Sequence, residues 1–211
     1  MPTTSASLKT IERLCIYRRI LRNLNKEGIA NVYSHQLARM IGVSAAQIRR
    51  DLMVVGYTGS PIKGYQVNQL LASISEFLDN PCSQNICIIG VGNLGRAILA
   101  YIPGRHTHLN IVAGFDVDEH KINRVIVGCR CYHLNELPKI VKEKNITVAI
   151  IATPAETAQD VANRVISSGI KSILNFAPMT LKVPKDVFVE YMDISVALEK
   201  TAYFAKCHTS E

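Results

Sequence analysis

The stretch ICIIGVGNLG, residues 86–95, decides the fold of this 211-residue chain. The continuous apolar run ICII is typical of a strand that is buried on both faces. It leads directly into a Gly-x-Gly-x-x-Gly pattern that opens a helix-like segment. In this pattern the first glycine makes a tight turn, the second lets the backbone approach a pyrophosphate, and the third lets helix and strand pack closely. The predicted cofactor-binding residues of this loop are Gly90, Val91, Gly92, Asn93, Leu94 and Gly95.

Similar apolar runs follow along the chain, and helix-like segments alternate with them. The runs are IVAGFD (111–116), TVAIIAT (147–153) and SILNFA (172–177), and the helix-like segments are 93–102, 134–144 and 156–168. This alternation predicts an α/β domain, a parallel sheet with helices on both faces. The pyrophosphate of a dinucleotide would then lie on the amide groups at the N-terminus of the first helix.

An acidic residue stands where a dinucleotide site needs one. Asp116 ends the second predicted strand, 21 residues after Gly95. A carboxylate at this position accepts hydrogen bonds from ribose hydroxyls and repels a 2′-phosphate, which favours NAD(H) over NADP(H). Two later strand ends, Thr153-Pro154-Ala155 and Asn175-Phe176, would edge the nicotinamide half, although Phe176 could equally be a core residue. The alternative is a glycine turn in a sheet that binds nothing.

Composition and charge narrow the class of protein. Apolar residues make up 48% and charged residues 19% of the chain, which is globular usage, and the length predicts one to two domains. The start lacks the apolar segment of a signal peptide, and no run approaches the roughly 20 apolar residues of a membrane helix, so we expect a cytoplasmic protein. Residues 1–80 hold 10 basic and 5 acidic side chains, so +5 of the formal net charge of +7 lies there, which suits a module that faces a polyanion.

Residues 34–54, SHQLARMIGVSAAQIRRDLMV, predict a helix-turn-helix. Ser34 and Ser44 are placed to cap two helices, and Gly42 supplies the turn between them. Ile48 and Leu52 share the inward face of the second helix. Other side chains of that helix face outward, and small, amide and guanidinium groups of this kind read base edges and hold phosphates. These outward residues are Ala46, Gln47, Arg49 and Arg50.

The turn-rich segment GYTGSPIKGY, residues 56–65, would make a β-hairpin wing after this motif. Lys63 would lie at a phosphate, and Tyr65 would pack at the base of the wing. The predicted DNA-binding residues are Ser44, Ala46, Gln47, Arg49, Arg50, Lys63 and Tyr65. The alternative is a surface helical hairpin with incidental arginines. The tail, residues 193–206, has the pattern of one amphipathic helix.

The cysteines and histidines do not form a metal-binding pattern. The six cysteines contain no Cys-x-x-Cys pair, and Cys129-Arg130-Cys131 is one residue too tight for a zinc knuckle. The six histidines lack ligand spacing. We therefore predict no metal site and no disulfide framework, with Cys87 as a small core residue.

These pieces together resemble the Rex family of redox-sensing transcriptional repressors over nearly the whole chain, from about Thr10 to Lys206. The motifs that carry the resemblance are Tyr17-x-Arg19, QIRRDL (47–52), GYTGSPIKGYQV (56–67), IIGVGNLGRAI (88–98), AGFD (113–116), LNFAP (174–178) and MDIS (192–195). Departures are Arg18, where an apolar or aromatic residue is common, Arg96 after the glycine motif, and the two cysteines in CRCYH (129–133), which leave thiol sensing open.

The resemblance implies a winged-helix DNA-binding domain over 1–80, with the helix-turn-helix at about 17–56, a Rossmann NAD(H)-binding domain over 81–190, and a swapped C-terminal helix over 191–211. It implies a homodimer, formed through the Rossmann domain and that helix, which binds double-stranded operator DNA with an inverted repeat. NADH would release the DNA, and NAD⁺ would oppose this. The resemblance also implies a polar network of Arg19, Tyr101 and Asp193 that couples the two sites, with Tyr101 beside the nicotinamide.

Two rival functions remain at this point. A small NAD-dependent dehydrogenase would need a substrate domain, but the 131 residues after 1–80 are nearly filled by a minimal dinucleotide fold. No Tyr-x-x-x-Lys pair or His–Asp acid/base set stands at the strand ends, so we predict no catalytic residue. A nucleotide- or CoA-binding scaffold is disfavoured by Asp116 and by the winged helix.

Overall fold

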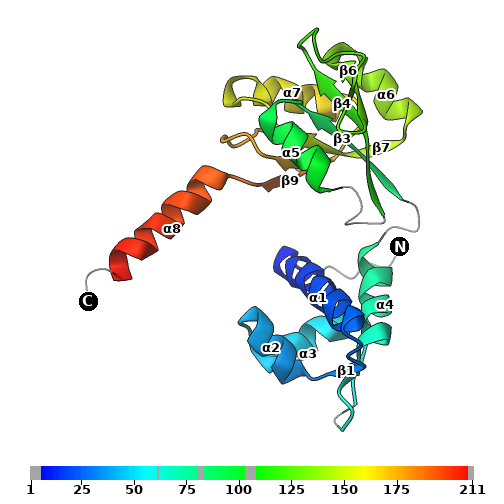
Figure 1. Cartoon of the computed structure of the whole chain (residues 1–211), viewed down its shortest axis with the longest axis vertical. Helices are drawn as coiled ribbons and strands as arrows, with labels where there is room; N and C mark the ends of the chain where they lie inside the picture. The colour runs from blue at the N-terminus through cyan, green and yellow to red at the C-terminus, as the bar shows by residue number, and fades with distance from the viewer. Residues whose placement is uncertain (1–5, 61, 80–82, 103–107, 209–211) are drawn as a thin grey trace. The chain divides into compact units, whose positions relative to one another are not determined.

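The computed structural model describes residues 6–60, 62–79, 83–102 and 108–208 (Figure 1). The chain divides into two compact units, Met1–Pro81 and Cys82–Glu211. The break that the sequence suggests near Asn80-Pro81 lies outside the described residues.

The first unit is mainly helical, with one small antiparallel sheet. Its elements are α1 (Leu8–Lys26), β1 (Asn31–Val32), α2 (Ser34–Ile41), α3 (Ala45–Val54), β2 (Tyr65–Gln66) and α4 (Val67–Leu78). In the sheet, Asn31 pairs with Gln66 and Val32 with Tyr65. The apolar faces of all four helices meet in one core, whose fully buried members include Leu14, Leu21, Leu37, Ile48, Leu52, Leu70 and Ile74. This arrangement confirms the predicted winged helix-turn-helix.

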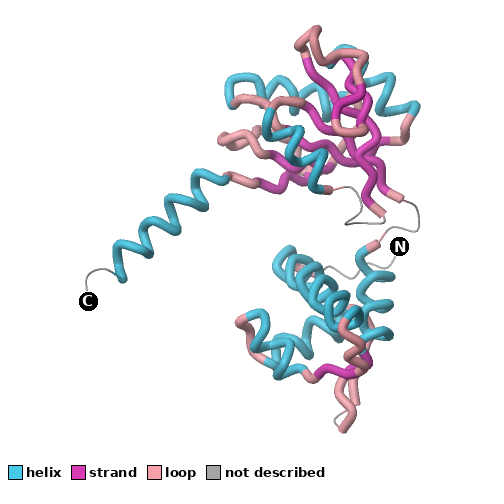
Figure 2. Tube along the Cα trace, viewed as in Figure 1, coloured by secondary structure: helices cyan, strands magenta, loops and turns pink. Residues whose placement is uncertain are grey.

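The second unit is built on one sheet of seven strands in the order β5-β6-β4-β3-β7-β8-β9, drawn in magenta in Figure 2. The strands are β3 (Gln84–Ile89), β4 (Leu109–Asp116), β5 (Val125–Ile126), β6 (Cys129–His133), β7 (Ile146–Ile151), β8 (Ser172–Asn175) and β9 (Phe188–Tyr191). All neighbours pair in parallel except β5 and β6, which form an antiparallel hairpin. Without β5, the order corresponds to 3-2-1-4-5-6, the dinucleotide-binding arrangement.

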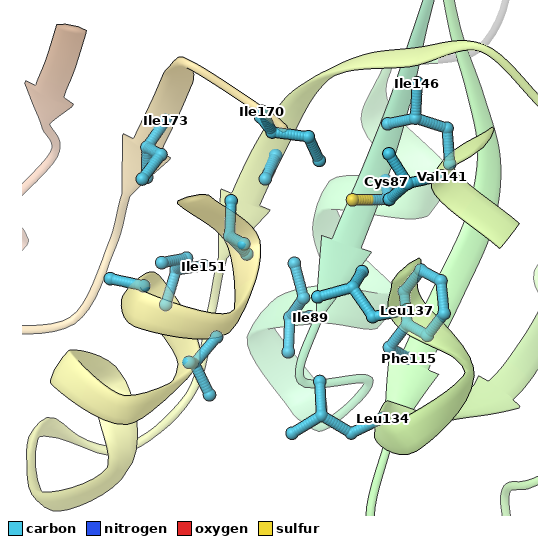
Figure 3. Close-up of a cluster of buried hydrophobic side chains, with 14 of the residues drawn as sticks. Cys87, Ile89, Phe115, Leu134, Leu137, Val141, Ile146, Ile151, Ile170 and Ile173 are labelled. Carbon is cyan, nitrogen blue, oxygen red and sulfur yellow. The ribbon is translucent and has the colours of Figure 1, made fainter. Parts of the chain in front are cut away.

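Helices cover both faces of this sheet, as the alternating pattern predicts. The helix α5 (Asn93–Tyr101) packs on one face, where Ile98 and Leu99 join the inward side chains of the strands. The helices α6 (Leu137–Glu143) and α7 (Ala155–Ser167) pack on the other face. Figure 3 shows that core, in which Phe115 and Ile89 from the strands meet Leu137 from α6.

The structure differs from the sequence prediction at several elements. The predicted helix 134–144 is a 3-10 turn, η1 (Leu134–Glu136), followed by α6, with Pro138 in its first turn. The CRCYH segment is the strand β6, and β9 extends the sheet beyond the predicted strands. The predicted tail helix is α8 (Ile194–His208), and every one of its side chains from Ile194 to Lys206 is exposed.

Candidate functional site

The glycine loop between β3 and α5 has the backbone geometry that its spacing predicts at all three glycines. A Cβ on Gly90, whose φ is +91°, would lie 2.6 Å from the carbonyl oxygen of Ala152, and a Cβ on Gly95 would collide with the carbonyl oxygen of Gly90. Gly92 has nothing within 4 Å of its Cβ position, so the space above it is open. Gly92 is also the N-cap of α5 and brings no side chain to the N–H groups there. These features fit a pyrophosphate on the helix N-terminus.

The loop lies where the strand order reverses, between β3 and its neighbours β4 and β7. Gly90 N–H donates to the Phe115 carbonyl at 2.8 Å, and Ala152 N–H donates to the Ile89 carbonyl at 2.8 Å. In open α/β sheets, ligands bind at this switch point. The Thr153 hydroxyl is buried there and has no hydrogen-bond partner within the described part of the chain. A buried hydroxyl without a partner is costly, so a ligand at this edge fits the protein.

Asp116 is joined to the glycine loop by its side chain. Its Oδ2 accepts from Val91 N–H at 2.9 Å and from Lys121 Nζ at 3.0 Å, while its Oδ1 accepts from the N–H groups of Val117 and Asp118. Burial alone would raise the pKa of the Asp116 carboxyl, but these hydrogen bonds outweigh it and hold the pKa below its usual value. The carboxylate is therefore charged and fixed beside the loop.

Lys121 is the residue of this site that sequence reasoning missed. Its ammonium also lies 3.4 Å from Asp118 Oδ2, and the hydrogen bond to Asp116 raises its pKa. The available signal was a lysine five residues after Asp116, the acid predicted to bind the ribose. On its own that signal is weak, because loops after strands commonly carry lysines.

The other predicted cofactor residues lie at several places. Pro154 and Ala155 begin α7. Asn175 is buried, and its side chain bonds only to the backbone of its own loop, at Ala177 and Met179, among the described residues. Phe176 is half-buried and packs against the apolar core beneath α5. This placement agrees with the alternative interpretation that Phe176 is a core residue. Tyr101 is exposed at the far end of α5, about 12 Å along the helix from Asn93.

The outward face of α3 carries the predicted cationic surface. Ala46, Arg49 and Arg50 are exposed, and Ser44 caps the helix by accepting from Gln47 N–H at 3.1 Å. Arg49 reaches back to the Ser34 hydroxyl of α2 at 3.3 Å. The glycine between the helices, Gly42, ends α2 in the left-handed conformation.

The wing is a short hairpin held by Tyr33, the residue between β1 and α2. Ser60 and Gly64 form its bridge, and the Tyr33 hydroxyl donates to the Ile62 carbonyl at 2.9 Å. Lys63 is exposed at the tip. Tyr65 is buried, so its ring supports the wing from within, as expected for a residue at its base.

A buried carboxylate ties α3 to α1, and sequence reasoning missed it. Asp51 is 2% exposed and receives a fork from Arg13, with Nε 2.6 Å from Oδ2 and Nη2 2.7 Å from Oδ1. The Tyr17 hydroxyl donates to Oδ2 at 2.6 Å, and Gln47 Nε2 donates to Oδ1 at 2.9 Å. The signal was Asp51 itself, three residues after the inward Ile48. A buried acid needs partners, and Gln47 four residues earlier is one that helical spacing indicates, but the spacing cannot identify the donors from α1.

The charge state of this cluster follows from its contacts. Burial favours the neutral acid, but the hydrogen bonds from Arg13, Tyr17 and Gln47 outweigh it and hold the pKa of Asp51 below its usual value. Burial, and then the hydrogen bond to Asp51, raise the pKa of Tyr17, and the same carboxylate raises the pKa of Arg13. Asp51 is thus an anion with four donors.

The residues of the implied coupling network have local surroundings of their own. Arg19 is exposed on α1, whereas its neighbour Arg18, a departure from the family pattern, pairs with Asp79 just after α4. Asp193 Oδ1 accepts from the N–H groups of Ser195 and Val196 and so caps α8.

The thiols of β6 do not have the surroundings of reactive cysteines. Cys129 and Cys131 are both buried. Burial raises the pKa of both, that of Cys131 to about 11, and it raises the pKa of Cys87 to about 12. A thiol that stays protonated is a poor nucleophile, so the structure favours a packing role.

No group of three or more metal-binding side chains exists among the described residues, and none of the helices there could span a membrane.

Known protein families match residues in both units. Residues 6–52 match the family described as putative DNA-binding protein N-terminus, and residues 82–179 match the CoA binding domain family. Relatives from Anoxybacillus flavithermus and Desulforamulus reducens, each called redox-sensing transcriptional repressor Rex, are both 40% identical. The first alignment covers 96% of this chain and 95% of the relative, and the second covers 90% of each.

Two solved structures are similar over the whole length. RSP in complex with β-NAD⁺ and operator DNA has a TM-score of 0.90 at 32% identity, covering 98% of this chain and 95% of that one. RSP in complex with β-NADH has a TM-score of 0.86 at 31% identity, covering 98% and 97%.

Proposed function

We infer the function from one premise: the chain belongs to the Rex family of redox-sensing transcriptional repressors. The protein is a transcriptional repressor that binds operator DNA when the ratio of NADH to NAD⁺ is low and is released by NADH. Its cofactors are NADH and NAD⁺. The observation that carries this function is the pairing of a winged helix, whose α3 exposes Arg49 and Arg50, with a dinucleotide loop in the same chain.

We propose the following residues as the ones that hold each ligand. Gly90, Gly92 and Gly95 shape a cradle for the pyrophosphate, Asp116 faces the ribose, and the Thr153 hydroxyl gains a partner when the dinucleotide binds. When bound, the dinucleotide supplies a ring that is neutral when reduced and positively charged when oxidised. Ala46, Gln47, Arg49 and Arg50 face the major groove, and Lys63 contacts a phosphate beside it.

We also propose that the protein is not an enzyme. A hydride-transferring enzyme needs an acid or base beside the nicotinamide. Among the described strand ends, Thr153 and Asn175 offer neither. Both relatives named above are called repressors. We also propose that the protein is in the cytoplasm, where the operator DNA is.

We propose a homodimer that involves α8. The large apolar side chains of α8 are 57–68% exposed, and they are Ile194, Val196, Leu198, Tyr203 and Phe204. Contact of so much apolar surface with water is unfavourable for a monomer. A swapped helix would bury this face against the partner's Rossmann domain. Light scattering should give twice the chain mass, and a chain ending at Asp193 should give a monomer. A dimer that survives the truncation would place the interface elsewhere.

The direct test is DNA binding with and without the effector. Labelled duplexes selected from random sequence should bind the protein at nanomolar to micromolar concentration, and NADH should weaken that binding while NAD⁺ does not. Binding that ignores NADH would contradict the proposed switch, and oxidation of NADH in the presence of a carbonyl substrate would favour the dehydrogenase alternative.

A further inference from the structure

The Gln47 side chain lies beside the exposed face of α3 but is tied back to Asp51. We propose that Asp51 is a positioning residue that turns the amide oxygen of Gln47 toward the DNA, so that Gln47 selects an amino base, adenine or cytosine, over a keto base in each half-site. This inference rests on the proposed function, because it requires α3 to enter the major groove.

Chemistry fixes which atom of Gln47 faces Asp51. A carboxylate only accepts hydrogen bonds, so it holds the NH₂ group of an amide and not its oxygen. The distance from Gln47 Nε2 to Asp51 Oδ1 is 2.9 Å. The oxygen and nitrogen of an amide branch from the same carbon, so pinning the nitrogen to Asp51 points the oxygen away from it. Within the described residues, that oxygen accepts no hydrogen bond, and Gln47 is only half-buried.

The cluster beneath Gln47 keeps Asp51 charged and in place. Oδ1 also receives Arg13 Nη2, and Oδ2 receives Arg13 Nε and the Tyr17 hydroxyl. A carboxylate has about four lone-pair sites, so this one is saturated. The planar fork of Arg13 fixes the orientation of the carboxylate, and with it the direction from which Gln47 must donate.

The comparison with α2 shows that Gln47 is not used as an ordinary cap. Both helices begin with a glutamine at the third position. In α2 the Gln36 side-chain oxygen accepts from Tyr33 N–H at 2.8 Å, which is the glutamine half of a capping box. In α3 the spacing Ser44-x-x-Gln47 would allow the same bond, yet the Gln47 amide goes to Asp51. The oxygen of Gln47 therefore remains available to a ligand.

The available oxygen determines what Gln47 can read. In the major groove adenine N6 and cytosine N4 are donors, whereas guanine O6 and thymine O4 are acceptors. A fixed acceptor discriminates between these two groups on one strand. A free glutamine would offer either its oxygen or its nitrogen, and it would discriminate less because it could turn over.

The test uses the full-length protein, without NADH, to select duplexes from a pool of randomised DNA. The selected duplexes are then sequenced. The wild type should select an inverted repeat in which one position of each half-site prefers adenine or cytosine by about fivefold to a hundredfold. Gln47→Ala should make that position indifferent and leave the others unchanged. Lys63→Ala is the control, since loss of a phosphate contact should weaken binding to all sequences alike.

The positioning role of Asp51 has its own test. Asn at this site can donate as well as accept, so Asp51→Asn should relax the preference although Gln47 remains. Because this variant can unfold, the wild type is also studied by nuclear magnetic resonance of ¹⁵N-labelled protein. One proton of the Gln47 side-chain NH₂ group should exchange slowly with water, and Gln36 serves as the reference amide whose nitrogen has no such partner among the described residues.

Three results would overturn the inference. Gln47→Ala with an unchanged preference at every position would mean that Gln47 reads no base. A preference for guanine or thymine that depends on Gln47 would mean that its nitrogen faces the DNA. A folded Asp51→Asn with undiminished preference, or a rapidly exchanging Gln47 amide, would remove Asp51 from the role. If the wild type selects no sequence at all, the proposed repressor function itself fails.

Discussion

At the scale of single residues, we propose that the choice of nucleotide depends on Asp116 together with Lys121. In this proposal the carboxylate would repel a 2′-phosphate, and it also neutralises the ammonium of Lys121, which lies 3.0 Å away. Asp116→Ala removes the repulsion and leaves the cation in place. We expect this variant to bind NADH more weakly and NADPH more tightly, narrowing the preference by about tenfold or more, because unit charges 4 Å apart interact by ~1 to 4 kcal/mol between bulk water and a protein surface. Isothermal titration calorimetry measures both affinities.

The control is the double variant Asp116→Ala with Lys121→Ala. It lacks the cation as well, so the part of the gain in NADPH affinity that comes from the unpaired ammonium should disappear, while the loss in NADH affinity remains. Equal affinity of the wild type for NADH and NADPH would show that Asp116 does not face the 2′ position.

Asp51 gives the first unit an acid-sensitive stability. Its pKa in the folded chain lies below the ordinary 3.8, so between these two values the unfolded chain binds more protons. The stabilisation is therefore present above about pH 4 and is lost as the pH falls through the folded pKa. At pH 7, Asp51→Asn should lower the free energy of unfolding by about 3 kcal/mol, since a buried pair loses one partner.

Urea denaturation from pH 2.5 to 7 tests this stability, with the exposed Asp186 as the matched control. Asp186 pairs with Lys171 at the surface of the second unit, so Asp186→Asn should change little at any pH. The wild type and Asp51→Asn should converge in acid. A constant difference over the whole range would mean that the Asp51 charge contributes nothing.

The sequence predicts individual residues where one local pattern contains the whole reason. Gly90, Gly92 and Gly95 are such a case, because turn, approach and packing all follow from their spacing. Asp51 and Arg13 are the opposite case: they are 38 residues apart, and no local sequence pattern indicates that they form an ion pair. Gln47 could be placed on α3 from periodicity, four residues before Asp51 on the same helix, but the donors from α1 that hold Asp51 appear only in the folded unit.

At the scale of elements, the strands that the sequence predicts are the continuous apolar runs in the centre of the sheet. The strand β6 was missed because only Cys129-Arg130-Cys131 alternates between buried and exposed in a strand of five residues, and its burial depends on β4 beside it. The edge strand β9 was missed because Phe188 and Tyr191 are exposed and give no alternation. Strand ends and edges are set by neighbours far along the chain, so local patterns do not determine them.

The wing depends on a close approach at Gly64. A Cβ there would lie 2.7 Å from the Val32 carbonyl oxygen and 3.0 Å from the Tyr33 ring, at a φ of +69°. Gly64→Ala should push the wing away from β1 and lower DNA affinity by about tenfold, since a positive φ alone costs ~1 to 2 kcal/mol and the collision adds to it. NADH affinity should not change.

Gly56→Ala separates the two effects in the wing. Gly56 has a φ of +70° but nothing within 4 Å of its Cβ position. It should therefore show the backbone cost without the collision, and its DNA affinity should fall less. Fluorescence anisotropy with a selected duplex measures both variants. Equal losses would mean that contact with β1 does not hold the wing.

The cationic elements predict a salt dependence. If Arg50 on α3 and Lys63 on the wing each neutralise one phosphate, Arg50→Ala and Lys63→Ala should each reduce the slope of log affinity against log salt by about one. Arg164 of α7, which bonds to Asn135 in the second unit, serves as a control arginine. Binding titrations at several salt concentrations give the slopes, and unchanged slopes in both variants would place the DNA on another surface.

At the scale of the whole molecule, the two sites must share one equilibrium. The reduced nicotinamide ring is neutral and the oxidised ring is a cation, so a site can tell them apart by charge and shape. To release DNA, NADH must bind the DNA-free arrangement more tightly than the DNA-bound one, because a ligand with equal affinity for both shifts nothing. Linkage then requires DNA to weaken NADH binding by the factor by which NADH weakens DNA binding, typically 1–3 kcal/mol of coupling.

Asp193 is the residue at which this coupling can be separated from local structure. It caps α8, so Asp193→Ala removes both the charge and the cap, whereas Asp193→Ser removes the charge and keeps a capping oxygen. If Asp193 belongs to a network with Arg19 and Tyr101, both variants should still bind NADH and DNA separately, and both should show a smaller coupling factor. Titrations of NADH with and without the duplex measure that factor. Full coupling in Asp193→Ser together with a loss in Asp193→Ala would make Asp193 a cap only, and the switch would then depend on how α8 packs.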